Sequence, residues 1–318
     1  MDHRWQPRAP WPRDLVRPVP VDPAGVAGPT KRQAAGAYWR RTSSGLHVPV
    51  DTDRDRVEQR VLEQSLRLPP GGAVTGWAAC RVHGAAFFDG LARDGRTRLP
   101  VPLAVGPAGR VRTGPEARTV HHVLLDEDRA VRHGVPVVVQ ARAAYDAVRL
   151  APDPRAAVVN LDMALAARIV TLDELVAYAA RQPRDRRLVR RAARLSSPYS
   201  RSPRETELRL VWLLDARLPP PLVNGEVRDR DGRLLGIADL LDVDAGLVVE
   251  YDGADHRSGR RQAADLRRED DLRRVGLEVV RVAGADERDR VVRRLHEARA
   301  RCRFEAPDQR RWVAVPAR

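Results

Sequence analysis

The sequence contains few cysteines, few aromatic residues and almost no lysine. Of its 318 residues, 2 are cysteines, Cys80 and Cys302, and 4% are aromatic. Two thiols can form neither a disulfide framework nor a four-thiolate zinc site, which indicates a reduced setting. No uncharged apolar run reaches the length of a membrane span, and the amino terminus, MDHRWQPRAPWPRD, lacks the apolar segment of a signal peptide. The sequence therefore predicts a cytoplasmic protein with no membrane partner.

The scarcity of lysine means that arginine supplies almost all of the positive charge. Lys31 is the one lysine in the chain, yet the formal net charge is +14. An excess of this sign favours a polyanionic partner, since each phosphate contact releases counterions. A GC-rich genome also encodes arginine and alanine in excess. Composition alone therefore leaves two interpretations, nucleic-acid binding and a bias of the genome.

The amino-terminal part divides into a lead-in and a folded region. Residues 1–30 are rich in proline and have little periodic apolar pattern, which predicts a disordered or loosely packed lead-in. Residues 31–180 show strand and helix patterns that predict a smaller, mixed α/β domain. The expected elements are a hairpin around Ser44-Gly45, helices over 53–68, 74–84, 141–150, 154–167 and 171–180, and strands over 99–105 and 118–124.

A basic stretch follows this domain. Seven arginines lie between Arg181 and Arg194, and a polar, turn-rich segment, SSPYSRS, comes after them. Residues 181–199 are therefore interpreted as a basic helix and a linker. The helix is either a solvated connector or a phosphate-contacting element, and its candidate DNA contacts are Arg186, Arg187, Arg190 and Arg191.

Residues 200–305 follow an order of helix, three-stranded meander, helix, strand and helix. Ser202-Pro203-Arg204-Glu205 has the residue types of a strong helix start, with serine at the N-cap and glutamate at the third position. Strands are expected over 222–228, 234–243, 247–251 and 277–282, and helices over 262–275 and 286–301. Residues 306–318 are expected to form a tail.

Acidic residues occupy strand positions that usually hold apolar side chains. Asp239 follows Gly-Ile-Ala, and Glu250 follows Leu-Val-Val. Glu250 and Asp252 are two residues apart, so on a regular strand both point to one face. A carboxylate on a buried face is costly unless it is paired or binds a cation. The pattern therefore predicts Asp239, Glu250 and Asp252 as ligands of Mg²⁺ or Mn²⁺, which prefer oxygen donors.

Each of these acids also has a simpler interpretation when it is taken alone. Asp252, followed by glycine, is typical of a turn, and Asp239 is compatible with an exposed strand end. Glu205 is compatible with a role in helix capping only. The order and spacing of all of them together favour a common site.

Three segments, GIADLLD, LVVEYDGADHR and DLRREDDLRRVGLEVVRV, resemble the very-short-patch-repair-like endonuclease domain, a branch of the PD-(D/E)xK superfamily. The matching landmarks are Glu205 in the first helix, Asp239 in a strand, Glu250 to His256 as E-x-D-G-x-x-H, Asp265, Arg268 and Leu272 as D-x-x-R-x-x-x-L, then Gly276 and Arg281. The resemblance implies a restriction-endonuclease-like core with a mixed sheet flanked by helices. It also implies a Mg²⁺-dependent endonuclease that acts on DNA in repair or in defence against phages and mobile elements.

The same resemblance implies roles for individual residues. It assigns catalytic positions to Glu205, Asp239, Glu250, Asp252 and His256. Arg268 and Arg281 then either clamp phosphate or form salt bridges with the acids. The lysine of the wider superfamily, two residues after the motif acid, is replaced here by Asp252, and no lysine lies in residues 200–305. The group that activates water is therefore left open.

The amino-terminal region resembles an abortive-infection antitoxin-like region that often precedes this nuclease domain. The similarity rests on AVTGWAACRVHGA, GVPVVVQARAAYDAV and AVVNLDMALAARIVTLDEL, and on a wing-like segment, YWRRTSSGLHVPV. These stretches are also compatible with an ordinary amphipathic core. The resemblance implies an alternative function, a DNA-binding antitoxin-like regulator with an inactive nuclease fold and a cognate toxin as its partner. An RNA nuclease is a third hypothesis, because sequence does not separate the substrates.

Overall fold

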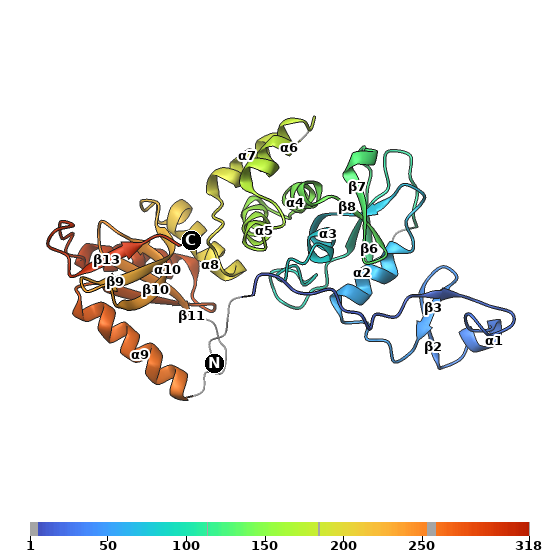
Figure 1. Cartoon of the computed structure of the whole chain (residues 1–318), viewed down its shortest axis with the longest axis horizontal. Coiled ribbons are helices and arrows are strands. Elements are labelled where there is room, and N and C mark those ends of the chain that lie inside the picture. Colours follow the sequence, from blue (N-terminus) through green and yellow to red (C-terminus); the bar gives the residue numbers. More distant parts are fainter. Residues whose placement is uncertain (1–5, 113, 184, 253–258, 318) are drawn as a thin grey trace. The chain divides into compact units, whose positions relative to one another are not determined.

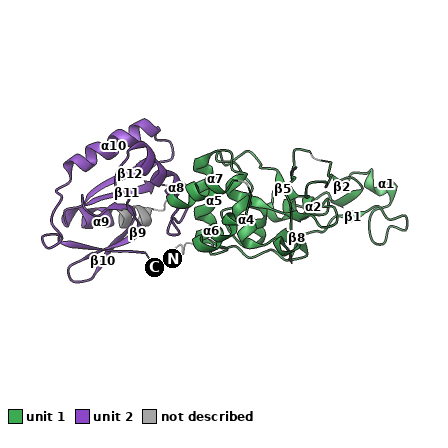
Figure 2. Cartoon of the chain, turned by 90° about the horizontal axis from the view of Figure 1, so that it is seen from above, with its two compact units in different colours: residues 1–194 green, residues 195–318 purple. Residues whose placement is uncertain are grey.

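The computed structural model describes residues 6–112, 114–183, 185–252 and 259–317 (Figure 1). In this part the chain is a mixed α+β protein with one three-stranded and two five-stranded sheets. It divides into two compact units, Met1–Arg194 and Leu195–Arg318 (Figure 2). The amino-terminal unit is therefore the larger one, which corrects the expectation of a smaller amino-terminal domain.

A small antiparallel sheet begins the first unit. Its order is β1-β3-β2, and its strands, with the short helix between the first two, are β1 (Val19–Pro20), α1 (Lys31–Ala34), β2 (Trp39–Ser43) and β3 (Leu46–Pro49). The hairpin predicted around Ser44-Gly45 is confirmed. Within the predicted lead-in over residues 1–30, Val19 and Pro20 pair with His47 and Leu46 of β3, so this short part is an ordered strand. Proline is tolerated in β1 because β1 is an edge strand, where a missing donor costs little.

The second sheet mixes parallel and antiparallel pairs. Its order is β6-β5-β4-β8-β7, and its strands are β4 (Ala73–Val74), β5 (Val101–Ala104), β6 (Ala117–Val120), β7 (Arg129–Arg132) and β8 (Val135–Val138). The pairs β4–β8 and β5–β6 are parallel. The sequence predicts β5 and β6. It does not reveal β4, β7 and β8; β4 has only two residues, too few to show a period of two.

Helices complete the first unit. They are α2 (Val57–Ser65), α3 (Gly76–Val82), the short η1 (Asp126–Asp128), α4 (Gln140–Arg149), α5 (Pro154–Ala166) and α6 (Leu172–Ala180). The five longer helices confirm the predicted ones. The reciprocal capping of α6 by Thr171 and Glu174 is also found. None of the helices in the described part of the chain is long and apolar enough to cross a membrane.

The basic helix α7 (Arg186–Leu195) closes the first unit. Val189 and Ala192 are buried, while the arginines around them are exposed. The division into units keeps the helix with the amino-terminal unit up to Arg194. This division assigns the part of the predicted 181–199 helix and linker up to Arg194 to the first unit and the part from Leu195 to the second.

The second unit contains a five-stranded sheet of order β12-β11-β10-β9-β13. Its elements are α8 (Pro203–Leu210), the π-helical turn η2 (Val211–Asp215), β9 (Leu222–Asp229), β10 (Leu234–Asp242), β11 (Leu247–Asp252), α9 (Gly259–Arg274), β12 (Glu278–Ala283), α10 (Arg288–Arg301) and β13 (Trp312–Val315). The predicted meander, strand and helices are confirmed. The tail over 306–318 is wrong, because β13 pairs with β9 along the edge of the sheet.

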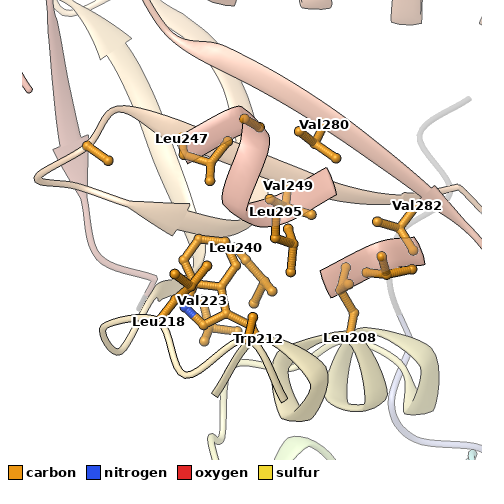
Figure 3. Packing of buried hydrophobic residues seen from close by; sticks show 14 residues of the cluster. Leu208, Trp212, Leu218, Val223, Leu240, Leu247, Val249, Val280, Val282 and Leu295 are labelled. Atoms are coloured by element: carbon orange, nitrogen blue, oxygen red, sulfur yellow. The ribbon is translucent and has the colours of Figure 1, made fainter. Parts of the chain in front are cut away.

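Two apolar cores lie on opposite faces of this sheet. On β11, Val249 belongs to one core and Val248 to the other, as the two-residue period of a strand requires. One core packs the sheet against α8, η2 and α10, with Trp212 and Leu295 fully buried (Figure 3). The other packs it against α9 through Leu272. The sheet is thus covered by helices on both faces, and the acidic residues lie on its central strands β10 and β11.

Candidate functional site

The pairing of β10 with β11 brings Asp239 and Glu250 together. Leu240 pairs with Val249 in antiparallel register, so the next residues along the two strands are Asp239 and Glu250. Opposite residues of an antiparallel pair have neighbouring side chains. The backbone N–H of Tyr251 donates to Asp239 Oδ2 at 2.7 Å, which fixes this carboxylate against the next strand. The predicted meeting of these two acids is therefore found.

Arg268 of α9 holds the Glu250 carboxylate. Glu250 is only 8% exposed, and Arg268 Nη2 lies 2.7 Å from its Oε1. The same guanidinium donates through Nη1 to the backbone oxygen of Ile237 at 3.3 Å. Arg268 crosses β10 at Gly236, where an added Cβ would lie 3.1 Å from Arg268 Cδ. Arg268 thus supplies the positive charge that a buried carboxylate requires.

Glu205 lies in the first turn of α8, and its carboxylate is held by several donors. The backbone N–H of Glu205 donates to Ser202 Oγ at 3.2 Å, as expected for an N-cap serine. The Ser202 hydroxyl donates in turn to Glu205 Oε1 at 3.1 Å. The backbone N–H of Arg201 and Asn224 Nδ2 donate to Oε2 at 2.8 and 2.7 Å. Ser202 therefore caps α8 as predicted, but the Glu205 carboxylate accepts from the backbone N–H of Arg201 and not from that of Ser202, so it is held in place without forming the capping box.

Glu205 also belongs to the same electrostatic site as the two strand acids. Burial raises the pKa of Asp239 to about 7, and the negative charge of Glu205 is the next cause of that rise. Glu250 adds to it, whereas the Tyr251 N–H and the Arg268 charge act in the opposite direction. Like charges close together disfavour ionisation. The charges of Glu205 on α8 and of Glu250 on β11 therefore both act on Asp239 of β10.

The donor chemistry of this site fits a divalent cation. Among the described residues, no three histidine, cysteine, aspartate or glutamate side chains are grouped so as to hold a metal ion. The expected set of Asp239, Glu250 and Asp252 is thus not assembled. Mg²⁺, however, is commonly held by one or two carboxylates, with water and substrate phosphate as its other ligands. Asp239 and Glu250 suit that role: burial, and then the neighbouring negative charges, raise the pKa of Asp239, and a bound cation would offset both costs of its ionised form.

The other predicted site residues have different positions. Asp252 is half-buried at the end of β11, paired in register with Ala283. His256 lies outside the described residues. Arg281, adjacent to Glu250 in the parallel pairing of β11 with β12, forms an ion pair with Glu269 at 2.8 Å. Arg268 therefore forms a salt bridge with a site acid, Glu250, whereas the printed partner of Arg281 is Glu269, which is not one of the predicted site acids.

Exposed arginines of α7 form a separate basic surface on the first unit. Its members are Arg186, Arg187, Arg190 and Arg191. Within the described residues, none of these four forms an ion pair. Their guanidinium groups are thus available to phosphate, although Glu205, Asp239 and Glu250 lie in the other unit.

Asn224 and Glu269 are parts of the site that sequence reasoning missed. Asn224 holds Glu205, and Glu269 holds Arg281. The signal for Asn224 was the Asn224-Gly225 pair within an apolar strand pattern, since this dipeptide usually marks a turn. Glu269 gave no signal, because it is one of many charges on α9.

The raised pKa of Asp239 predicts how the stability of the metal-free protein depends on pH. Between pH 3.8, the ordinary pKa of an aspartate, and about 7, the folded state holds a proton that the unfolded state has lost. Stability therefore falls as pH rises through this window and stays lower above it. Asp239→Asn removes the titrating carboxyl group, and the amide oxygen of the asparagine can still accept from the Tyr251 N–H. We expect the variant to gain about 4 kcal/mol relative to the wild type between pH 4 and pH 8.

Urea unfolding of both proteins across this pH range, without divalent metal, measures that difference. Addition of Mn²⁺ at pH 8 should stabilise the wild type and not the variant. Two stability curves that run parallel from pH 4 to pH 8 would show that Asp239 titrates normally.

Comparison of this chain with protein-family models, with curated proteins and with solved structures finds no match.

Proposed function

We propose that this protein is a metal-dependent phosphodiesterase, an endonuclease of the PD-(D/E)xK type that acts on DNA. The observation that carries the proposal is the meeting of Asp239 and Glu250 on neighbouring strands, with the charge of Glu205 close enough to raise the pKa of Asp239. The element order of the second unit also supports a restriction-endonuclease-like core. The net charge of +14 supports a polyanionic substrate.

The residues of the site have distinct parts in this function. Asp239 and Glu250 would hold Mg²⁺ or Mn²⁺, and Glu205 would reach it through water. A bound Mg²⁺ acts as a Lewis acid on phosphate and lowers the pKa of bound water. Arg268 offers a guanidinium beside Glu250 that can pair with a phosphate oxygen. Asp252 and His256 keep the catalytic roles that the resemblance implies, as predictions.

The competing proposal is a DNA-binding, antitoxin-like regulator with an inactive nuclease fold and a cognate toxin as its partner. One observation favours it: Glu250 already has a cationic partner in Arg268, so its charge is compensated without metal. A regulator of this kind needs the basic surface of α7 and a stable fold, but no cation. The two proposals differ in whether bound DNA is cut.

An assay with three substrates tests the proposal. Supercoiled plasmid, single-stranded DNA and RNA are incubated with the full chain in Mg²⁺, in Mn²⁺ and with a chelator. The proposal predicts cleavage of DNA in either metal and none with the chelator. Cleavage of RNA alone would support the third hypothesis, an RNA nuclease, and binding to DNA without cleavage of any substrate would favour the regulator.

A further inference from the structure

Asn224 connects β9 to the carboxylate of Glu205. Its side chain is buried, with 2% exposed, in the middle of the second unit. Asn224 Nδ2 donates to Glu205 Oε2 at 2.7 Å and to the backbone oxygen of Tyr199 at 2.9 Å. Both partners are pure acceptors, so the amide nitrogen and not the amide oxygen must face them. The two contacts tie the loop before α8, the carboxylate and β9 to one another.

The backbone at Asn224 is adapted to this arrangement. Its φ of +50° lies in the left-handed region, although the residue is part of strand β9. Asparagine is among the few residues other than glycine that adopt this region readily. A left-handed residue interrupts a regular strand and changes the direction in which its side chain leaves the sheet. Here the result is an amide that meets the carboxylate on α8.

The amide of Asn224 is an uncharged donor, and this matters because Glu205 lies among other carboxylates. Helix α8 packs against β10 and β11 in one apolar core, and the negative charge of Glu205 acts on Asp239, so Glu205 needs a donor that keeps it in place. Glu250 receives a charged donor, Arg268, which cancels its charge. Asn224 donates to Glu205 without a charge of its own, and the backbone N–H of Arg201 does the same. The negative charge of Glu205 is therefore retained beside Asp239.

We infer that Asn224 is a positioning residue of the carboxylate site, which holds Glu205 beside Asp239 through an uncharged hydrogen bond and so preserves the site's affinity for a divalent cation. The inference rests on the proposed function, because that function supplies the cation. It gives Asn224 a role that acts through Glu205 and involves no contact with substrate.

A double-mutant cycle separates this role from a merely structural one. Asn224→Gly removes the amide and suits the left-handed backbone. Glu205→Gln removes the negative charge and keeps an acceptor for Asn224. Mn²⁺ binding is measured by calorimetry on the full chain for the wild type, both single variants and the double variant. If Asn224 acts through the charge of Glu205, the two losses of affinity are not additive.

We expect Asn224→Gly to weaken Mn²⁺ binding by about 10- to 100-fold, the usual effect of removing a group that holds a metal ligand in place. The double variant should bind no more weakly than Glu205→Gln alone. In cleavage assays, the loss should appear in the Mn²⁺ concentration needed for half-maximal rate, and saturating Mn²⁺ should restore the rate. Asn160→Ala is the matched control, because it removes one amide-to-backbone bond, Asn160 Nδ2 to Ala147 at 2.8 Å, in the other unit.

Three outcomes would contradict the account in distinguishable ways. A wild type that binds no Mn²⁺ overturns the proposed function, and the inference with it. A wild type that binds Mn²⁺, with Asn224→Gly binding equally well, overturns the inference alone, and so do losses that multiply in the double variant. If Asn224→Gly lacks a cooperative unfolding transition, Asn224→Ser is used in its place. Asn224→Ser is expected to weaken Mn²⁺ binding by the same amount, and wild-type affinity in this variant would overturn the inference.

Discussion

Replacing Asp239 by asparagine or Glu250 by glutamine is expected to lower the rate of DNA cleavage by at least about a thousandfold. Each substitution keeps the size of the side chain and removes the negative charge that would hold the cation. Asparagine at 239 still accepts from the Tyr251 N–H, and glutamine at 250 still accepts from Arg268. The loss should therefore arise from the chemistry of the site and not from unfolding. Single-turnover cleavage of plasmid in Mg²⁺ measures it.

Glu226→Gln is the matched control for this experiment. Glu226 lies on β9 of the same sheet and forms an ion pair with Arg228 at 2.7 Å, outside the site. This variant should cleave at the wild-type rate. Equal rates for the wild type, Asp239→Asn and Glu250→Gln would show that the two acids do not form the catalytic site.

Neutralising Arg186, Arg187, Arg190 and Arg191 to glutamine is expected to weaken DNA binding by roughly 10²- to 10³-fold at physiological salt. The four guanidinium groups are exposed on α7, whose other side is buried through Val189 and Ala192. Each phosphate contact contributes about 0.9 to the slope of log affinity against log salt, so loss of all four should reduce that slope by roughly 3 to 4. Binding is measured by fluorescence anisotropy over a range of salt concentrations.

A control variant separates a contact surface from a general effect of charge. Arg54, Arg96, Arg110 and Arg112 are also exposed on the first unit and lie outside α7. Their replacement by glutamine changes the net charge equally and should leave the slope close to that of the wild type. If both variants change the slope by the same amount, α7 is a solvated connector and the binding depends on total charge.

The elements of the second unit were predictable because β10 and β11 are largely apolar runs of nine and six residues, long enough to be recognised as strands. Val248 and Val249 belong to different cores, and the N-cap at Ser202 carries the residue types of a helix start. β13 was not predictable in this way, since its four residues gain their structure from pairing with β9, far away in the sequence. The same reason applies to β1, which is stabilised by the hairpin strand β3. The pattern of residues within a short segment does not show which distant strand the segment will pair with.

The sequence predicted which acidic residues belong to the candidate site, but it did not predict the side chains that hold them. Acidic residues within apolar strands identified Asp239 and Glu250, because burial of a carboxylate needs a reason. Their partners depend on tertiary structure: Arg268 reaches Glu250 by crossing β10 at Gly236, and Asn224 reaches Glu205 through a left-handed backbone. Neither partner follows from spacing along the chain.

Titration of the wild-type protein with Mn²⁺, with metal binding by calorimetry and plasmid cleavage followed on the same samples, measures whether cleavage depends on a cation bound at Asp239 and Glu250. We expect cleavage to be absent without metal, to rise in proportion to the occupied metal site and to be lost in Asp239→Asn together with metal binding. A wild-type protein that binds DNA with a steep salt dependence, yet neither binds Mn²⁺ nor cuts the plasmid at any concentration, would contradict this expectation.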